Sequence, residues 1–319
     1  MIDPQERWAQ YGEKPDYAGL LTYGGQPFTE DPAELAGADV AIVGAPTDDL
    51  VSDRPGTRYG PRAIRSASCP LGPHLEVGID ALAALKVIDF GDAPVVPADA
   101  ARSQEAIEAT VAQVVEAGAL PVVLGGDHSI SEPDVRAVAK RRGPVVLVHF
   151  DTHTDTGTEV FGVSFSHGTP MYKLVEAGHV DPARYVQIGL RGYWPGEREF
   201  AWQREHGIAS FFMHDVRERG IRAVVGDALE RVGAGPVFVT VDIDVLDPAF
   251  APGTGTPEPG GMTTGDLLWA CREVAANVDL VGADVVEVIP TAVGSADITA
   301  LAADRVVREL LTGLALARK

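Results

Sequence analysis

Histidine and aspartate are concentrated in three short segments of this sequence. The segments read GGDHS over residues 125–129, DTHTDT over 151–156 and DID over 242–244. Imidazole and carboxylate groups are typical ligands of divalent metals such as manganese. The two cysteines lie far apart and form no CxxC pair, which argues against a structural zinc site of the thiolate type. We therefore predict a metal site whose ligands are His128, Asp151, His153, Asp155, Asp242 and Asp244.

Each segment taken alone has an ordinary explanation. A single DxD pair is common in proteins that bind no metal, and a histidine after two glycines is compatible with a buried structural role. Carboxylates and imidazoles buried together without a cation would repel one another or lose their charge. The combination of the three segments therefore favours metal binding over three unrelated structural roles.

Short apolar runs alternate with amphipathic stretches along the whole chain. Most of the runs lack a strict apolar–polar alternation, which is typical of strands buried on both faces. The runs cover 39–44, 86–90, 120–124, 145–150, 185–189, 209–213, 237–241 and 280–288. Helical spacing predicts helices over 101–117, 131–142, 169–177, 197–206, 264–275 and 297–315. This alternation predicts a three-layer αβα fold with a mainly parallel sheet of about eight strands.

The predicted strands explain how the three segments meet. Each segment directly follows a predicted strand, and the last predicted strand carries Glu287. Ligands of open α/β sheets bind beyond the carboxyl ends of the strands. Residues two apart on a strand point to the same side. Asp151 and Asp155 should therefore converge with His153, provided that the extended backbone continues past the strand end.

Composition and charge narrow the class of partner. The 319 residues show no repeat or linker, so we predict one domain over 1–319 with an irregular N-terminal segment over 1–31. A formal net charge of -20 argues against a nucleic-acid partner and favours a small cationic substrate. No apolar run reaches the roughly 18 residues of a membrane span, and the polar N-terminus does not resemble a secretory signal. With Cys69 and Cys271 interpreted as reduced, buried thiols, we expect a cytoplasmic protein.

In this order, the motifs resemble the arginase/agmatinase (ureohydrolase) family. The resemblance extends over nearly the whole chain, and its further motifs are GAPTD (44–48), RPGTRYGPRAIR (54–65), SHGTP (166–170), VDIDVLDPAFAPGTGTP (241–257) and VEV (286–288). It implies an arginase/deacetylase-like fold and two Mn²⁺ ions, with Ni²⁺ as an alternative metal. One ion would be bound by His128, Asp151, Asp155 and Asp242. The other would be bound by Asp151, His153, Asp242 and Asp244.

The resemblance also implies a reaction. Family members cleave a guanidinium group to urea and an amine, with a metal-activated water as the nucleophile. By this resemblance His167 transfers a proton and Glu287 binds the guanidinium group. Thr256 contacts the substrate, and Asp155 also accepts a hydrogen bond from the nucleophile. Without the family match, His167 is better interpreted as a loop histidine with a structural hydrogen bond. The net negative pocket is consistent with a cationic substrate.

The substrate beyond its guanidinium group is less well defined. Gly157 stands where arginases carry an asparagine for the α-carboxylate, so arginine is disfavoured. We predict agmatine, which would yield putrescine. The alternatives are a guanidinobutyrase, a proclavaminate-type amidinohydrolase or another guanidine hydrolase. Two departures from the family pattern are Thr152, which replaces an alanine, and 288–294, which lacks the usual proline, aromatic and aspartate after Glu287.

Other expectations follow from the same resemblance. A homo-oligomer, either a trimer or a hexamer, is implied. A zinc deacetylase of related fold would need one metal ion, and a non-catalytic relative would have no reason to keep the complete candidate site. Trp194, Met213 and His214 are candidates for lining the entrance of the substrate site, although core or surface packing is the first prediction for each.

Overall fold

The centre of the molecule is a parallel β-sheet. The computed structural model describes residues 12, 14–15, 18–70, 72–194, 196–291 and 297–319. Within these residues, eight strands pair in parallel in the order β2-β1-β3-β8-β7-β4-β5-β6. The strands are β1 (Val40–Ala45), β2 (Val87–Asp92), β3 (Leu120–Gly125), β4 (Val146–Phe150), β5 (Val186–Leu190), β6 (Ala209–Phe212), β7 (Pro236–Asp242) and β8 (Asp279–Val286). The predicted sheet is confirmed, and each predicted boundary lies within two residues of the observed one.

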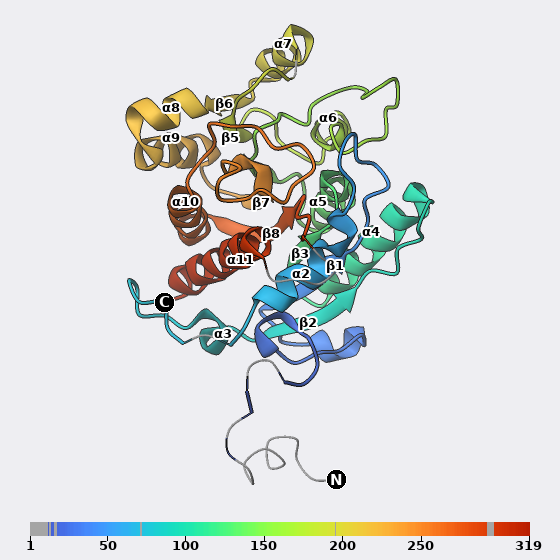
Figure 1. Ribbon diagram of the computed structural model, residues 1–319, viewed down its shortest axis with the longest axis vertical. Helices are drawn as coiled ribbons and strands as arrows, with labels where there is room; N and C mark the ends of the chain where they lie inside the picture. The colour runs from blue at the N-terminus through green and yellow to red at the C-terminus, as the bar shows by residue number, and fades with distance from the viewer. Residues whose placement is uncertain (1–11, 13, 16–17, 71, 195, 292–296) are drawn as a thin grey trace.

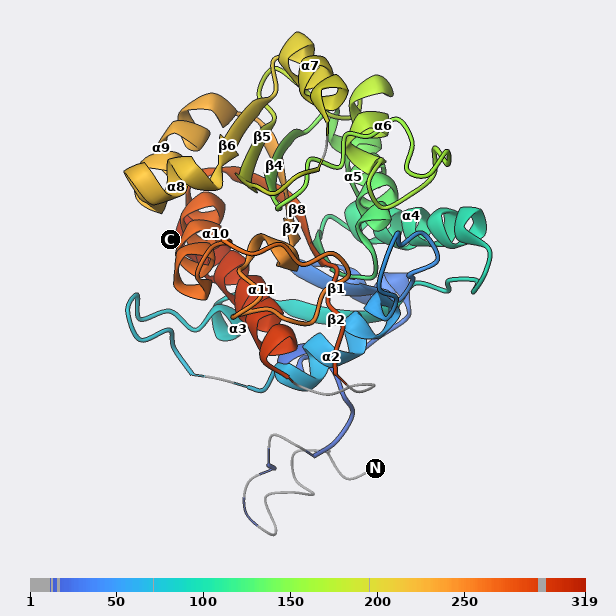
Figure 2. The same cartoon turned by 45° about the horizontal axis from the view of Figure 1, so that its top comes forward.

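Helices cover both faces of this sheet (Figures 1 and 2). On one face lie α2 (Gly60–Ala67), α8 (Met213–Arg219), α9 (Ile221–Val232), α10 (Thr264–Asn277) and α11 (Ile298–Ala317). On the other face lie α4 (Ala100–Glu116), α5 (Ser131–Arg142) and α6 (Pro170–Glu176). Two further helices, α3 (Ala81–Ala84) and α7 (Glu197–His206), lie at the periphery. The αβα layers are therefore as predicted, although α2, α3, α8 and α9 were not among the predicted helices.

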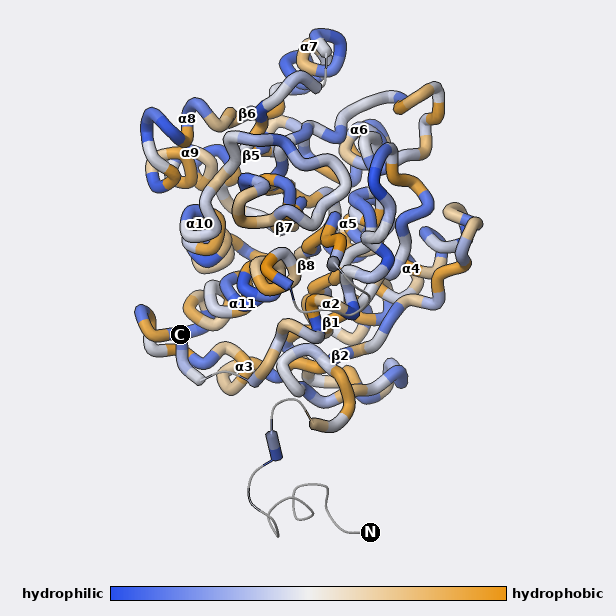
Figure 3. Tube along the Cα trace, in the orientation of Figure 1, coloured by the Kyte–Doolittle hydropathy of each residue, from blue (hydrophilic) through white to orange (hydrophobic). Residues whose placement is uncertain are grey.

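Each central strand contributes to two apolar layers. On β4, Val146 and Val148 pack in the layer with α9, α10 and α11, whereas Leu147 packs in the layer with α4 and α5. Figure 3 shows hydrophobic stretches along β1 and β8 and a largely hydrophilic α7 at the rim. Burial on both faces explains why the strand sequences lack alternation. No helix in the described residues is long and apolar enough to cross a membrane.

The described part of the predicted irregular segment 1–31 is anchored to the sheet. It contains a 3-10 turn, η1 (Tyr23–Gly25), whose Tyr23 side chain is buried. The Tyr23 backbone N–H donates to Asp89 Oδ2 at 2.7 Å. Both cysteines are free, with Cys271 buried in α10 and Cys69 half-buried. The remainder of the N-terminal segment lies outside the described residues.

A pair of carboxylates is buried between β8 and α5. Ser131 Oγ donates to Asp284 Oδ2 at 2.7 Å, whereas neither carboxylate oxygen of Asp134 has a hydrogen-bond partner in the described chain. Burial, and then repulsion by Asp284, holds the pKa of Asp134 well above its ordinary value. The folded chain therefore keeps this proton to higher pH than the unfolded chain does. A group of this kind lowers stability progressively as pH rises above its unfolded-state pKa.

Asp134→Asn is expected to stabilise the protein because an amide cannot ionise. We expect the free energy of unfolding to rise by roughly 1–3 kcal/mol at pH 8 and by less at pH 5. Urea unfolding of parent and variant at both pH values measures the difference. Glu230→Gln, an exposed change on α9, is the matched control. A variant that is less stable at both pH values would show that Asp134 has a structural role that needs its carboxyl group.

Candidate metal centre

The three histidine- and aspartate-rich segments meet in the middle of the sheet. Their strands are β3, β7 and β4, and β8 lies between β3 and β7 in the sheet order. All these strands run in parallel, so their carboxyl ends lie at the same edge. The sheet order thus brings together side chains that are more than 100 residues apart in sequence, as in the His128–Thr240 contact.

A first group of ligand atoms surrounds His128. Its Nδ1 lies 2.8 Å from Asp155 Oδ2, 3.1 Å from Asp151 Oδ2 and 3.3 Å from Asp242 Oδ2. None of these contacts has hydrogen-bond geometry, so the buried Nδ1 has no hydrogen-bond partner among the described residues. The other ring nitrogen, Nε2, lies 2.9 Å from Thr240 Oγ1. If Nε2 donates to Thr240, an unshared electron pair on Nδ1 faces three carboxylates, which is the arrangement that a bound cation would satisfy.

A second group adjoins the first through Asp151. His153 Nδ1 lies 3.1 Å from Asp244 Oδ2 and 3.5 Å from Asp151 Oδ1. Asp151 therefore presents one oxygen to each group. Asp242 Oδ2 faces the first group, while its Oδ1 accepts the backbone N–H of Asp244 at 2.8 Å. The geometry agrees with a bridging role for Asp151, and bridging by Asp242 stays a prediction.

The electrostatics of the cluster favour the binding of cations. Burial, followed by repulsion from Asp244 and Asp151, raises the pKa of Asp242 well above its ordinary value. Burial alone would lower the pKa of His128, but the surrounding carboxylates of Asp151, Asp155 and Asp242 raise it well above the usual value. Without cations the cluster therefore retains protons. The orphaned Nδ1 and a donor set of imidazole and carboxylate groups fit two divalent cations of the manganese type.

Turns rather than continued strands make these ligands converge. β4 ends at Phe150, and Asp155 has a positive φ of 50°. β7 ends at Asp242, and the chain then enters a 3-10 turn, η5 (Ile243–Val245). The expectation that extended geometry persists past the strand ends is therefore wrong. Aspartate tolerates the left-handed region better than most residues, which makes the turn at Asp155 possible.

Glu287 also departs from its predicted position on the last strand. β8 ends at Val286, where it pairs with Asp242, and Glu287 follows with a φ of 63°. Its backbone N–H donates to Gly126 O at 2.9 Å, which redirects the chain at this point. A glutamate in the left-handed region is strained, and such strain is concentrated at functional sites.

The carboxylate of Glu287 is buried beside the cluster, and only one of its two oxygens has hydrogen-bond partners among the described residues. Its Oε1 accepts the backbone N–H of His128 at 2.9 Å and lies 2.9 Å from His167 Nδ1. Its Oε2 is buried without a hydrogen-bond partner among the described residues. A buried carboxylate with a free oxygen is a strong acceptor for a cationic donor.

His167 is held between Glu287 and Ser52. Its Nε2 lies 3.1 Å from the backbone N–H of Ser52 and 2.7 Å from Ser52 Oγ. Burial alone would lower the pKa of His167, but the Glu287 charge and hydrogen bond more than reverse this and raise it to about 9. The buried carboxylate therefore stabilises the protonated form of the imidazole.

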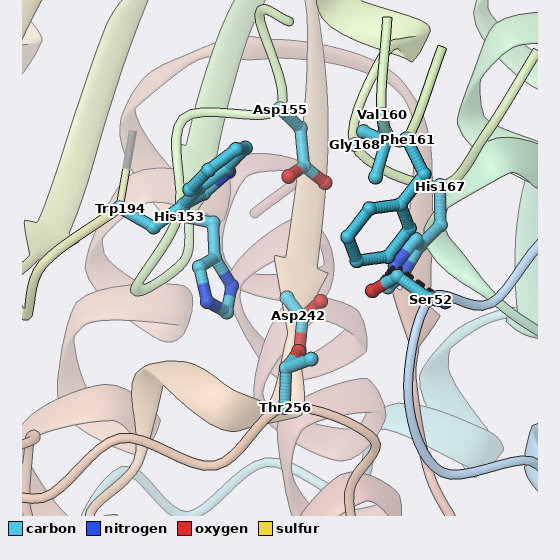
Figure 4. A pocket seen from close by; sticks show the side chains of 10 residues that line it. All are labelled: Ser52, His153, Asp155, Val160, Phe161, His167, Gly168, Trp194, Asp242 and Thr256. Atoms are coloured by element: carbon cyan, nitrogen blue, oxygen red, sulfur yellow. Dashed lines mark hydrogen bonds between the residues drawn. The ribbon is translucent and has the colours of Figure 1, made fainter. Parts of the chain in front are cut away.

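A cavity of about 250 Å³ opens onto these groups (Figure 4). Its lining residues are Ser52, His153, Asp155, Val160, Phe161, His167, Gly168, Trp194, Asp242 and Thr256. Trp194 lies on one side and Phe161 on the opposite side. Trp194 lines the cavity with a largely exposed side chain, which agrees with its candidate role at the entrance of the substrate site. Met213 packs in the core as predicted, and His214 on α8 is exposed away from the lining.

Two loops form the walls of the cavity. Val160 and Val163 exchange backbone hydrogen bonds of 2.9 Å, and between them Phe161 adopts a φ of 51° at the tip of a tight turn. The loop 248–261 carries Thr256, whose Oγ1 lies 3.5 Å from Asp244 Oδ2. Arg191 stabilises this loop by donating to the carbonyl oxygens of Asp244 and Glu258. The altered segment 288–294 is described only as far as 291, so its part from 292 onward lies outside the described residues.

Several residues next to the site were not predicted from the sequence. Ser52, Val160 and Phe161 line the cavity, and His149 lies beneath Asp151 with its Nε2 2.7 Å from Asp151 Oδ2. The position of His149 two residues before Asp151, on the same side of the strand, was the available signal. The other three lie in loops, where sequence periodicity gives no information about direction.

Several known proteins resemble this chain over most of its length. The family model described as "Arginase family" matches residues 38–313. The chain is 44% identical over 308 residues to the guanidinopropionase of Pseudomonas aeruginosa, covering 95% of this chain and 94% of that protein. It is 39% identical over 257 residues to the mitochondrial agmatinase of Gallus gallus, covering 80% and 75%. The structure of the proclavaminate amidinohydrolase of Streptomyces clavuligerus has a TM-score of 0.89 at 37% identity, covering 95% and 100%.

Proposed function

This chain belongs to the arginase family of guanidino-compound hydrolases, and we propose that it uses two Mn²⁺ ions to release urea from a linear guanidino substrate, with agmatine as the first candidate. One observation carries this proposal. The two ligand groups share Asp151 and adjoin the buried, half-satisfied carboxylate of Glu287. A site of this kind combines places for two cations with an acceptor for a cationic substrate.

The proposal assigns a role to each residue. His128, Asp151, Asp155 and Asp242 would hold one ion, and Asp151, His153, Asp242 and Asp244 would hold the other. Divalent ions bound there would supply an activated water at neutral pH. Ni²⁺ is the alternative metal, because it accepts the same ligand types. A single-metal deacetylase is not favoured, since two adjoining groups are present.

Glu287 is proposed to bind the guanidinium group. A planar guanidinium donates parallel N–H bonds to a carboxylate, and burial strengthens such a pair. Oε2 of Glu287 is available for this purpose, and Oε1 is shared with His167. Thr256 provides a hydroxyl on the cavity wall. The substrate carbon would then lie between Glu287 and the ligand cluster.

His167 is proposed to donate a proton to the departing amine. The donor is the charged imidazole, which is present below its pKa of about 9 and is lost above it. We expect His167→Ala to lower kcat by roughly 10²–10⁴-fold and to remove an alkaline limb near pH 9 from the pH profile. Urea release measured from pH 6 to 10.5 tests this, with His206→Ala on α7 as the control histidine. An unchanged alkaline limb in the His167 variant would contradict the assignment.

The cavity mouth favours a cationic tail. Phe161 and Trp194 present exposed aromatic side chains at the mouth, and aromatic faces attract ammonium groups. No lysine or arginine is found among the described lining residues, so a carboxylate tail would have no charged partner there. Gly157 offers no side chain for an α-carboxylate. These features favour agmatine over arginine and over guanidino acids.

Short guanidino acids are the second candidate substrates. The observation that favours them is the similarity to a protein named guanidinopropionase, at 44% identity over almost the full length. An identity averaged over the whole chain does not specify the cavity walls, because loops vary more than strands do. The two candidates differ in the charge of the tail and are separated by kinetics.

The decisive experiment is a substrate panel with the metal-reconstituted protein. Agmatine, 3-guanidinopropionate, 4-guanidinobutyrate and arginine are assayed for urea release after loading with Mn²⁺, Ni²⁺ or Zn²⁺. We expect the highest kcat/KM for agmatine with Mn²⁺, and the Phe161→Ala variant should lose activity on agmatine more than on the acids. Better turnover of either acid would overturn the agmatine assignment. No urea from any substrate, with two ions bound, would indicate a non-catalytic relative.

Assembly and location stay predictions. A trimer or hexamer is testable by light scattering of the metal-loaded protein. A cytoplasmic location is testable by fractionation of the source cells.

A further inference from the structure

A row of buried polar side chains crosses the sheet just below the metal centre. Gln187 on β5 pairs in register with His149 on β4, His149 with Thr240 on β7, and Thr240 with Asp284 on β8. All of these side chains are buried. The row spans four adjacent strands, where apolar residues would be the ordinary choice. The polar side chains at these four positions therefore indicate a function other than core packing.

His149 has a fully specified set of hydrogen bonds. Its Nε2 lies 2.7 Å from Asp151 Oδ2, and its Nδ1 lies 2.9 Å from the Tyr185 hydroxyl. The Gln187 amide nitrogen lies 2.7 Å from Thr154 O, 2.9 Å from the Tyr185 oxygen and 3.2 Å from His149 Nδ1. The Gln187 amide group can only donate through this nitrogen, so the Tyr185 oxygen accepts from it and the Tyr185 O–H donates to Nδ1.

This arrangement fixes the tautomer of His149. Because Nδ1 accepts, the ring proton is on Nε2 and is donated to Asp151 Oδ2. Burial raises the pKa of Tyr185 well above its ordinary value, which keeps the hydroxyl protonated as this arrangement requires. The hydrogen bonds thus run from the uncharged Gln187 amide through Tyr185 and His149 to the carboxylate of Asp151, which is shared by the two ligand groups.

We propose that His149 is a positioning residue that orients the shared carboxylate of Asp151 through its Nε2–H, with Tyr185 and Gln187 holding it in the donating tautomer. The inference rests on the proposed two-metal function. One hydrogen bond to Oδ2 fixes the rotation of the Asp151 carboxylate, and the His153 backbone N–H fixes Oδ1 at 2.6 Å. Both oxygens are then directed toward separate ligand groups before any cation arrives.

Direct metal ligation by His149 is the competing interpretation. One ring nitrogen of His149 lies within 4.8 Å of ligand atoms of His128, Asp151 and Asp155, so distance alone permits it. Two observations oppose ligation. Nε2 is already 2.7 Å from Asp151 Oδ2 in hydrogen-bond geometry, and the acceptor role of Nδ1 places the ring proton on Nε2. A protonated ring nitrogen has no lone pair for a cation.

Replacing His149 should weaken metal binding without removing a ligand. Hydrogen-bonding partners of metal ligands typically contribute 10–100-fold to metal affinity. We therefore expect His149→Leu and His149→Asn to bind two Mn²⁺ ions per chain, each about 10–100-fold more weakly. His149→Gln, whose amide N–H reaches about as far as Nε2, should restore most of the affinity. Tyr185→Phe should give a smaller loss, because Gln187 still donates to Nδ1.

The experiment measures Mn²⁺ affinity by chelator competition and stoichiometry by metal analysis, on purified full-length variants. The control is His74→Asn, which changes another hydrogen-bonded histidine, 3.0 Å from Glu309 and outside the site. Circular dichroism of the metal-free proteins shows whether each variant is folded. If His149→Asn does not fold, Tyr185→Phe and His149→Gln carry the test.

The outcomes separate the possible explanations. Weakened binding of both ions, with rescue by glutamine, supports the positioning role. One ion lost and the other bound at parental affinity would show that His149 is a ligand and overturn it. Unchanged affinity in His149→Asn, or a glutamine variant as weak as the leucine variant, would also overturn it. If the parent protein itself binds fewer than two ions, the two-metal function fails instead.

Discussion

Asp242→Ala is expected to abolish urea release and to release bound metal. Asp242 is the buried carboxylate whose Oδ2 lies 3.3 Å from His128 Nδ1, at the end of β7 in the centre of the sheet. Its removal takes one negative charge from the group of residues proposed to hold a divalent cation. We expect kcat to fall on the order of 10⁴-fold or more, since in the proposed reaction a bound metal would supply the nucleophile.

Two measurements distinguish this prediction from a general loss of fold. Metal analysis after desalting should find fewer than two ions per chain in the variant, and circular dichroism should find the parental helix content. Asp53→Ala is the matched control, because it removes the same charge from an exposed residue next to Ser52 at the cavity. Full metal content together with parental activity in Asp242→Ala would contradict the ligand assignment.

Glu287→Gln is expected to separate substrate binding from metal binding. The amide keeps the volume of the side chain and an oxygen that can accept the His128 N–H. It removes the charge that a guanidinium would pair with. Deleting one partner of a buried ion pair costs about 3–5 kcal/mol, so kcat/KM should fall by roughly 10²–10³-fold or more. The two metal ions should be retained.

The same variant makes a second, independent prediction about His167. The Glu287 carboxylate is the principal group that raises the pKa of His167 to about 9. In Glu287→Gln this pKa should move down toward its ordinary value, and the alkaline limb of the pH profile should move with it. Metal loss from Glu287→Gln, or from the harsher Glu287→Ala, would contradict the substrate-binding role. Glu258→Gln, in the loop that carries Thr256, is the charge-matched control.

Much of the architecture was predictable from the sequence because its causes are local. Strands buried on both faces require continuous apolar runs, and each run was found within two residues of its observed bounds. The ligand segments lie at the carboxyl ends of β3, β4 and β7, and a parallel sheet places these ends at one edge. The family motifs then indicated the reaction. None of this required knowledge of which strands are neighbours.

Tertiary structure alone decided how the site is assembled. β8 lies between β3 and β7, although it is the last strand in sequence, and this order brings Glu287 next to His128. The positive φ values of Asp155 and Glu287 replace the extended geometry that strand alternation predicted. Contacts with distant segments stabilise these strained conformations, and a sequence pattern does not encode them.

The same reason applies to the layer beneath the ligands. In the sequence, His149 is a single polar residue in an apolar run. The pairing of β4 with β5 and β7 places it in register with Gln187 and Thr240. The sequence by itself determined which groups can bind metal, because ligand chemistry belongs to single residues. Only the fold decided which ligand atoms face one another and what holds them there, because hydrogen bonds between strands depend on sheet order and register.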